Sequence, residues 1–214
     1  ERTSKASILG MVPSLRKKDE STSLIVAKRP KSMISESFRS IRTNLQFLSS
    51  QEGCKIMAIT STISGEGKTF IAINLGASLS LMGKKVLIMD FDMRKPRVHQ
   101  SFEIENIRGL SDVLINRLSL DECLNKFEYE PEKTSGTLCI DYLTSGPIPP
   151  NPSELISSDR TKELFKELRT KYDFVICDTP PIGIVSDALE LMKGADYPIY
   201  VLRADYSSKS FINN

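Results

Sequence analysis

The segment from Thr60 to Thr69 constrains the fold of this chain more than any other part of its sequence. It lies between a short apolar run and a helical pattern, and it reads Thr-Ser-Thr-Ile-Ser-Gly-Glu-Gly-Lys-Thr. The phosphate-binding motif is G-x-x-x-x-G-K-[ST]. Thr62 stands at the first glycine position here, whereas Gly67, Lys68 and Thr69 are intact. A chance Gly-Lys-Thr turn is the alternative, but a place between a strand and a helix is what the motif requires.

The residue types of this loop suit the oxygens of a phosphate chain. Backbone N–H groups at a helix N-terminus can surround the phosphates, Lys68 can reach the outer ones, and the Thr69 hydroxyl can ligate Mg²⁺. We therefore expect a nucleotide site. The residues expected to bind the nucleotide are Ser64, Gly65, Glu66, Gly67, Lys68, Thr69 and Phe70.

Short apolar runs alternate with helical stretches from Lys55 onward. We expect strands at 56–60, 86–89, 138–143, 174–177 and 199–202. Their near-continuous apolar character is typical of strands covered on both faces, and the segments between them are long enough for helical crossovers. We expect helices at 32–50, 68–82 and 161–172. The pattern predicts an α/β fold of the P-loop NTPase type, with a mostly parallel central sheet flanked by helices on both faces.

Charge is spread unevenly along the chain. The net charge is +2, but residues 1–31 carry eight basic residues against three acidic ones. That segment lacks sustained periodicity and contains Pro13 and Pro30, so we expect a basic linker or arm at 1–31 and the folded domain at 32–214. The chain opens at Glu1 rather than Met and stops just after a strand-like run. We therefore expect a domain cut from a longer protein, with its C-terminal tail truncated.

Several classes of protein are disfavoured by composition. The body outside the basic segment has a slight excess of acidic residues, so charge gives no support to nucleic-acid binding. No apolar stretch approaches the roughly 20 residues that cross a bilayer. The four cysteines form no C-x-x-C pair, and His99 has no partner at metal-ligand spacing, which argues against a structural metal site.

Carboxylates end two of the expected strands. Asp90 and Asp92 follow one apolar run and Asp178 ends another. Ligands of parallel sheets bind outside the carboxyl ends of the strands, where such groups can hold a magnesium ion directly or through water. Each carboxylate alone could simply cap the next turn. Together with the strand that precedes the phosphate-binding loop, they make three strand ends at one edge of the sheet, which favours the nucleotide site.

The chain resembles the bacterial tyrosine kinases (BY-kinases) in several motifs, in the same order and spacing. The likeness covers about residues 8–206. The matching segments are 64–69 (Walker A), 90–96 (Walker A′), 175–181 (Walker B), the E-x-x-R-x-x-R element at 36–42, and 146–155. Related ATPases that partition DNA or place division sites carry a signature Lys near the start of the loop. No Lys occurs at 62–64, which agrees with the kinase branch.

The resemblance implies an enzyme that transfers the γ-phosphate of ATP, with Mg²⁺, to protein tyrosines, including its own. Lys68 and Thr69 would act on the phosphates, Asp92 and Asp178 would support the magnesium ion, and Asp90 would be the base near the incoming phenol. The roles of Asp90 and Asp92 could be exchanged. The Walker A′ element also places Arg94 among the catalytic residues.

The resemblance also implies partners and a location. The family uses the E-x-x-R-x-x-R element between subunits, so Glu36, Arg39 and Arg42 would join a ring-like homo-oligomer; a solvated helix face is the alternative. The segment 8–13 is similar to the one that follows the last membrane helix in polysaccharide co-polymerases. The domain would then lie on the cytoplasmic side of the bacterial inner membrane, tethered to a membrane-spanning activator. Its further partners would be the polysaccharide polymerase and export machinery and a tyrosine phosphatase.

Two other functions remain open from the sequence alone. A non-kinase ATPase switch would use ATP to control assembly, with water as the acceptor, and a structural scaffold would keep the fold without turnover. The six tyrosines are scattered rather than clustered in a tail. Intact Lys68, Asp90, Asp92 and Asp178 weaken the scaffold reading.

Overall fold

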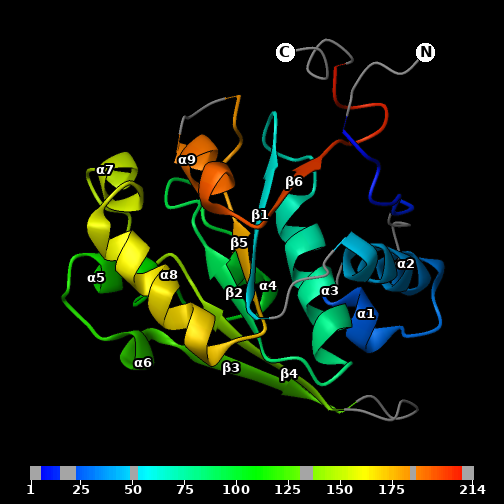
Figure 1. Ribbon diagram of the computed structural model, residues 1–214, viewed down its shortest axis with the longest axis horizontal. Coiled ribbons are helices and arrows are strands. Elements are labelled where there is room, and N and C mark those ends of the chain that lie inside the picture. Colours follow the sequence, from blue (N-terminus) through cyan, green and yellow to red (C-terminus); the bar gives the residue numbers. More distant parts are fainter. Residues whose placement is uncertain (1–5, 15–22, 49–52, 131–136, 184–186, 209–214) are drawn as a thin grey trace.

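The protein is built on a six-stranded sheet with the strand order β3-β4-β2-β5-β1-β6, as seen in the computed structural model (Figure 1). The structure describes residues 6–14, 23–48, 53–130, 137–183 and 187–208. The strands are β1 (Lys55–Ser61), β2 (Val86–Asp90), β3 (Asn125–Tyr129), β4 (Leu138–Leu143), β5 (Phe174–Asp178) and β6 (Tyr197–Val201). All neighbouring strands are parallel apart from β3 and β4. The expected mostly parallel α/β sheet is confirmed.

Helices cover both faces of this sheet. The described helices are α1 (Ile25–Lys28), α2 (Met33–Leu48), α3 (Lys68–Ser80), α4 (Val98–Ser101), α5 (Leu110–Leu114), α6 (Leu120–Cys123), α7 (Pro152–Ile156), α8 (Asp159–Lys171) and α9 (Asp187–Gly194). Figure 1 shows α1, α2 and α3 on one side of the sheet and α5 to α9 on the other. The three helices expected from the sequence are α2, α3 and α8, with ends that differ by one or two residues where they can be compared.

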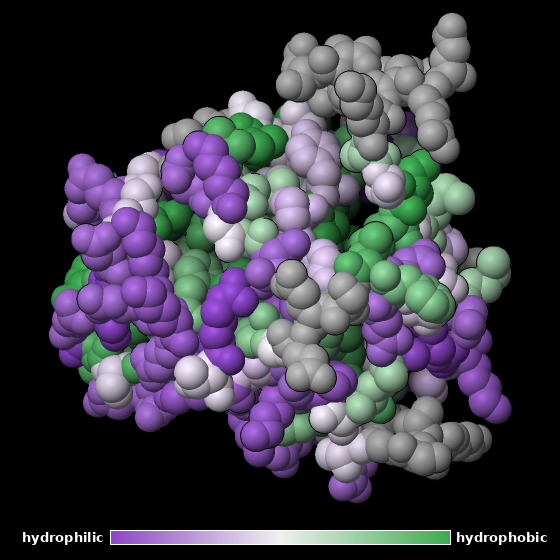
Figure 2. Space-filling view, viewed as in Figure 1, coloured by the Kyte–Doolittle hydropathy of each residue, from purple (hydrophilic) through white to green (hydrophobic). Residues whose placement is uncertain are grey.

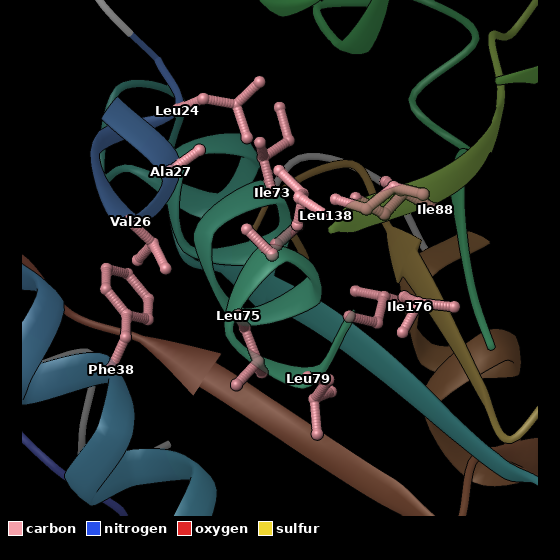
Figure 3. Packing of buried hydrophobic residues seen from close by; sticks show 14 of the residues in the cluster. Leu24, Val26, Ala27, Phe38, Ile73, Leu75, Leu79, Ile88, Leu138 and Ile176 are labelled. Carbon is pink, nitrogen blue, oxygen red and sulfur yellow. The ribbon is translucent and has the colours of Figure 1, made fainter. Parts of the chain in front are cut away.

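Each face of the sheet has its own hydrophobic core, because successive strand residues point to opposite faces. On the α3 face, Ile88 of β2 and Ile176 of β5 belong to a cluster with Ile73 and Leu75 of α3 (Figure 3). Gly76 lets α3 approach the sheet, since a Cβ atom there would lie 2.9 Å from Cδ1 of Ile88. The helix that starts at the phosphate-binding loop is thereby held rigidly on the central strands.

The second core lies under α8, whose outer surface is polar. Thr161, Leu164 and Leu168 of this helix are buried, and Leu87 and Val175 from the sheet belong to the same cluster as the two leucines. Figure 2 shows hydrophilic side chains gathered on the side of the molecule where α8 lies. None of the helices in the described part of the chain is both long enough and apolar enough to span a bilayer.

The segment expected to be a linker contributes to the core. Leu24, Ile25, Val26 and Ala27 are buried around α1, and Val26 faces Phe38 of α2 in Figure 3. The prediction of a linker over all of residues 1–31 is therefore wrong for residues 24–28. A single helical turn is too short to show a periodic pattern, so its four consecutive apolar residues gave no helical signal.

Two polar contacts fasten the N-terminal residues to the domain. Asn74 of α3 accepts a hydrogen bond from the Val26 N–H at 3.0 Å, and its amide donates to the Ser23 carbonyl at 2.7 Å. Further upstream, Asn44 of α2 donates to the Leu9 carbonyl at 2.8 Å. Most of the basic residues of the expected arm lie outside the described residues.

Candidate functional site

The expected site residues meet where β1, β2 and β5 end. Asp90 of β2 is the register partner of Asp178 of β5, and Asp178 is also the partner of Ile59 in β1. The phosphate-binding loop, residues 62–67, follows β1 directly and leads into α3. The structure therefore brings together the loop and the two acidic strand ends that the sequence predicted to converge.

The loop ends in a left-handed turn that opens the start of α3. Gly65 has φ of +90°, and Gly67, the N-cap residue, has φ of +97°. Side chains with a Cβ atom rarely adopt this conformation, so glycine is required. Gly67 offers no side-chain cap, and the described residues show no cap hydrogen bond at this end of the helix. Its first N–H groups and the positive end of its dipole are thus directed toward whatever anion binds there.

Lys68 and Thr69 are the first residues of α3. Lys68 is 7% exposed, and within the described part of the chain its ammonium group makes no hydrogen bond or ion pair. Its charge opposes the rise that burial causes in the pKa values of Asp92 and Asp178. With no hydrogen-bond or ion-pair partner among the described residues, the ammonium group is available to an anion such as a phosphate.

Asp178 is a buried carboxylate in contact with the first residues of α3. Thr69 donates a hydrogen bond from its hydroxyl to Oδ2 of Asp178, whereas Oδ1 is buried and has no partner among the described residues. Burial raises the pKa of Asp178 to about 7, although the Thr69 hydrogen bond and the Lys68 charge act in the opposite direction. An orphaned carboxylate oxygen beside a hydroxyl fits a hard cation such as Mg²⁺.

Asp90 holds the chain that follows β2. Its Oδ1 accepts from the Asp92 N–H at 3.2 Å, and its Oδ2 accepts from the N–H groups of Arg97 and Val98 at 3.0 and 2.9 Å. Burial, and then the charge of Asp178, raise the pKa of Asp90 well above its usual range. Both carboxylate oxygens are therefore committed to the backbone.

Asp92 and Arg94 lie on the loop that Asp90 holds. Asp92 is half-buried and accepts from the Lys95 N–H at 3.1 Å; burial raises its pKa. Arg94 donates to the Ser153 hydroxyl at 2.9 Å, which joins this loop to α7 within the 146–155 element. Within the described residues no group of three or more His, Cys, Asp or Glu side chains could hold a metal alone. Mg²⁺ is commonly held by one or two carboxylates and substrate phosphates, so this donor set is sufficient.

Two residues expected to bind nucleotide have other contacts. The Glu66 carboxylate is buried and accepts from the Ile63 N–H at 2.9 Å and from the Ser207 hydroxyl. Phe70 packs against Phe38 of α2, with ring centroids 6.0 Å apart. Both side chains support the loop and its helix.

Sequence reasoning missed the turn after β6, residues 203–207. Arg203 donates to the Gly65 carbonyl and Tyr206 donates to the Ser64 carbonyl, both at 3.0 Å. No motif marks this segment, and only proximity in the fold reveals its contact with the loop.

The Glu36, Arg39 and Arg42 side chains lie away from this site, on α2. Arg39 pairs with Glu36 and also donates to the Pro30 carbonyl. Arg42 donates to the Ser78 carbonyl of α3 at 2.9 Å, and burial lowers its pKa. The three residues thus have contacts within one chain.

Comparisons with known proteins agree with this geometry. Residues 54–212 match the family model described as an AAA domain. The tyrosine-protein kinase YwqD of Bacillus subtilis is 44% identical over 87% of this chain and 75% of its own length. The tyrosine-protein kinase wzc of Salmonella typhi is 36% identical over 80% of this chain, which covers only 23% of that protein.

Two solved structures are similar to this chain in fold and in sequence. The chimerical protein CapA2B2 is 40% identical, with a TM-score of 0.83 over 97% of this chain and 85% of that one. The septum site-determining protein MinD of Pyrococcus horikoshii, complexed with Mg-ADP, is 27% identical, with a TM-score of 0.55 over 69% of this chain and 57% of that one. The identity and coverage shared with YwqD, together with the Walker-type site, show that the chain belongs to the bacterial tyrosine kinase family.

Proposed function

We propose that this chain transfers the γ-phosphate of ATP to tyrosine side chains of proteins. The observation that carries the proposal is the meeting of an unpaired Lys68, the Thr69 hydroxyl and an orphaned Asp178 oxygen at the start of α3. Phosphoryl transfer depends mainly on positioning and on neutralising charge, and these groups can do both.

Lys68 and the loop would bind the phosphates. The N–H groups at the start of α3 have no side-chain cap, so they are available to phosphate oxygens. Lys68 is buried beside them, where its charge acts with little screening. Charge that develops on the γ-phosphate oxygens would therefore be stabilised most strongly in the transition state.

Thr69 and Asp178 would hold Mg²⁺. When bound, the ion neutralises phosphate charge and orients the leaving oxygens. The unpartnered Oδ1 atom of Asp178 supports this assignment.

The contacts of the two Walker A′ carboxylates favour Asp92 over Asp90 as the group that accepts the phenol proton. Asp90 is completely buried and both its oxygens accept backbone N–H groups, so it positions the loop. Asp92 accepts backbone hydrogen bonds from Lys95 and Arg94, but it is half-buried and so remains open to the site. The role of base that the family resemblance first suggested for Asp90 therefore passes to Asp92, and Asp90 is left as a positioning residue.

The wider setting follows from the family resemblance. We propose that the domain lies on the cytoplasmic face of the inner membrane, regulates polysaccharide export and assembles with copies of itself through α2. A tyrosine phosphatase would remove the phosphate groups that it adds. The segment 8–13 supports tethering, because its resemblance is to the chain that follows a membrane helix. The Leu9 carbonyl accepts a hydrogen bond from Asn44 of α2, so this segment contacts the domain.

An ATPase switch is the second candidate. The likeness to MinD in its Mg-ADP complex favours it, because that structure shares the fold without being named a kinase. Incubating the chain with ATP, Mg²⁺ and a tyrosine-rich peptide, followed by mass spectrometry, distinguishes the two. Lys84→Met, at an exposed position outside the loop, is the matched control. Phosphotyrosine formed by the wild type and by this control, but not by Lys68→Met, supports the kinase. ATP turnover without phosphotyrosine contradicts it.

A further inference from the structure

We propose that the turn after β6 positions the phosphate-binding loop, and that Arg203 and Tyr206 are its positioning residues. The inference rests on the proposed function only in that the loop binds the phosphates of ATP. Neither residue belongs to a nucleotide-binding motif, and they follow the loop by about 140 residues in the sequence.

The two residues bind consecutive carbonyl groups of the loop. Tyr206 Oη donates to the Ser64 carbonyl at 3.0 Å, and Arg203 Nη1 donates to the Gly65 carbonyl at 3.0 Å. Each hydrogen bond draws one carbonyl oxygen toward the turn. Because a trans peptide unit is planar, the N–H of the next residue then points the opposite way.

This orientation matters for binding an anion. Successive N–H groups directed to one side form a concave site for phosphate oxygens. A peptide flipped by half a turn would present its carbonyl oxygen instead, and that oxygen would repel the phosphate. By holding the Ser64 and Gly65 carbonyls, the turn keeps the N–H groups of Gly65 and Glu66 directed away from itself.

Glu66 adds a third fastening. A carboxylate within a phosphate-binding loop would repel its ligand if it faced the site. Its Oε2 accepts from the Ile63 N–H at 2.9 Å, and its Oε1 accepts from the Ser207 hydroxyl at the end of the turn. The side chain is 4% exposed, so these bonds hold a charge that would otherwise be buried without partners.

The turn is itself an ordered unit. The Ser207 N–H donates to the Arg203 carbonyl at 2.9 Å, and the Arg203 N–H donates to the Ser207 hydroxyl at 2.8 Å. The Arg203 guanidinium lies 5.2 Å from the centre of the Tyr206 ring. The pairing of β6 with β1 places this unit beside the loop, since Val201 is the register partner of Ser61.

Gly65 fits tightly beneath the turn. A Cβ atom at this position would lie 2.9 Å from the Tyr206 hydroxyl oxygen, in addition to the strain of its positive φ. The turn and the loop therefore have complementary shapes as well as complementary hydrogen bonds. A turn that merely ended the strand would not need so close an approach.

The test measures Mg-ADP affinity by isothermal titration calorimetry, together with kcat and KM for phosphorylation of a tyrosine-rich peptide. The double variant Arg203→Met/Tyr206→Phe removes both donors and keeps most of the side-chain volume. We expect its Mg-ADP dissociation constant to rise by about 5- to 50-fold, with a matching rise in KM for ATP and kcat within about threefold of the wild type. The variant Arg203→Lys/Tyr206→Phe keeps a donor at position 203, so it should bind Mg-ADP more tightly than Arg203→Met/Tyr206→Phe.

Matched controls are Tyr129→Phe on β3 and Arg117→Met after α5, which change the same groups far from the loop. A dissociation constant within twofold of the wild type in the folded double variant would overturn the proposal. If the double variant melts below the assay temperature, Tyr206→Phe alone decides in the same way, since its side chain is 49% exposed and its loss spares the core. If the wild type forms phosphotyrosine and the double variant binds ADP as tightly as the wild type, only this inference is refuted. If the double variant binds ADP more weakly but the wild type forms no phosphotyrosine, this inference is supported and only the kinase assignment is refuted.

Discussion

Arg42 of α2 donates a hydrogen bond from Nη1 to the Ser78 carbonyl of α3 at 2.9 Å. This bond fastens the E-x-x-R-x-x-R helix to the helix that starts at the nucleotide site. Glu36 and Arg39 of the same motif pair with each other at 67% and 40% side-chain exposure, and Arg39 also donates to the Pro30 carbonyl. The motif therefore divides into one residue that joins α2 to α3 and two whose polar contacts, within the described residues, are with their own helix and the chain before it.

Arg42→Ala should lower the free energy of unfolding by about 1–2 kcal/mol, because the Ser78 carbonyl loses a charged donor in a partly buried place. Glu36→Ala should change it by less than about 0.5 kcal/mol, since an exposed ion pair contributes little. Urea denaturation monitored by circular dichroism measures both. Equal effects of the two substitutions would contradict the division of the motif.

Assembly is the second test of α2. If Glu36 and Arg39 contact another copy, the Glu36→Ala/Arg39→Ala variant should shift a homo-oligomer toward monomer in analytical ultracentrifugation while its stability stays close to that of the wild type. Lys162→Ala on α8, which also removes an exposed i,i+3 ion pair, is the matched control. An unchanged distribution of species would count decisively against an interface on this helix.

Lys68→Met should abolish ATP turnover and leave the melting temperature close to that of the wild type. The Lys68 side chain makes no hydrogen bond or ion pair within the described residues, so its replacement breaks no such contact. Turnover should fall at least about 100-fold, because the proposed mechanism places Lys68 against the developing phosphate charge. Differential scanning fluorimetry and a phosphate-release assay measure the two effects. A folded variant with normal turnover would remove Lys68 from the mechanism.

Substitutions of the two Walker A′ carboxylates should have different effects, with Asp90 affecting mainly stability and Asp92 mainly activity. Asp90→Ala removes the acceptor of three backbone N–H groups and should cost about 2–3 kcal/mol of folding free energy. Asp92→Asn should leave stability within about 1 kcal/mol of the wild type but reduce kcat by about 10²- to 10³-fold. Chemical denaturation and peptide phosphorylation give the comparison. Full activity in Asp92→Asn would restore Asp90 as the candidate base.

Asp196 should make a small contribution to stability that depends on pH. Burial raises its pKa, but hydrogen bonds from Arg169 and from the Ile56 N–H lower it more, so the net shift is downward. A carboxylate with a lowered folded pKa stabilises the fold above its unfolded pKa of about 3.9, and that contribution is lost as pH falls through the folded value. Asp196→Asn should therefore be less stable than the wild type by about 1 kcal/mol or less at pH 7. In urea titrations the gap between the two proteins should narrow as pH falls below the unfolded pKa, and a constant gap would contradict the linkage.

Much of this fold was predictable because its signals are local. The loop at 62–67 and the apolar runs that became β1, β2, β4, β5 and most of β6 were recognised directly. The edge strand β3 was not, because its residues alternate between half-buried and exposed, and its Lys126 and Glu128 form an exposed ion pair. Only pairing with β4 makes this polar segment a strand.

The supporting contacts of the site were beyond reach for a related reason. The motif identifies Glu66 as a loop residue but does not show which way its carboxylate turns, since that depends on Ser207. In the same way, the sequence places Asp90 and Asp92 at one strand end, while their separate surroundings arise from the backbone of residues 97 and 98. Contacts between distant segments carry no signature in a single sequence.

The distance in sequence between the loop and the turn after β6 bears on how the domain matures during synthesis. The Gly65 carbonyl and its Arg203 donor are 138 residues apart, and a ribosome adds about 5–20 residues per second. The phosphate-binding loop therefore leaves the ribosome many seconds before the residues that fix its carbonyl groups. A nascent chain would pass through a stage in which the motif is present but its binding geometry is incomplete, so tight nucleotide binding begins only once nearly the whole domain has been made.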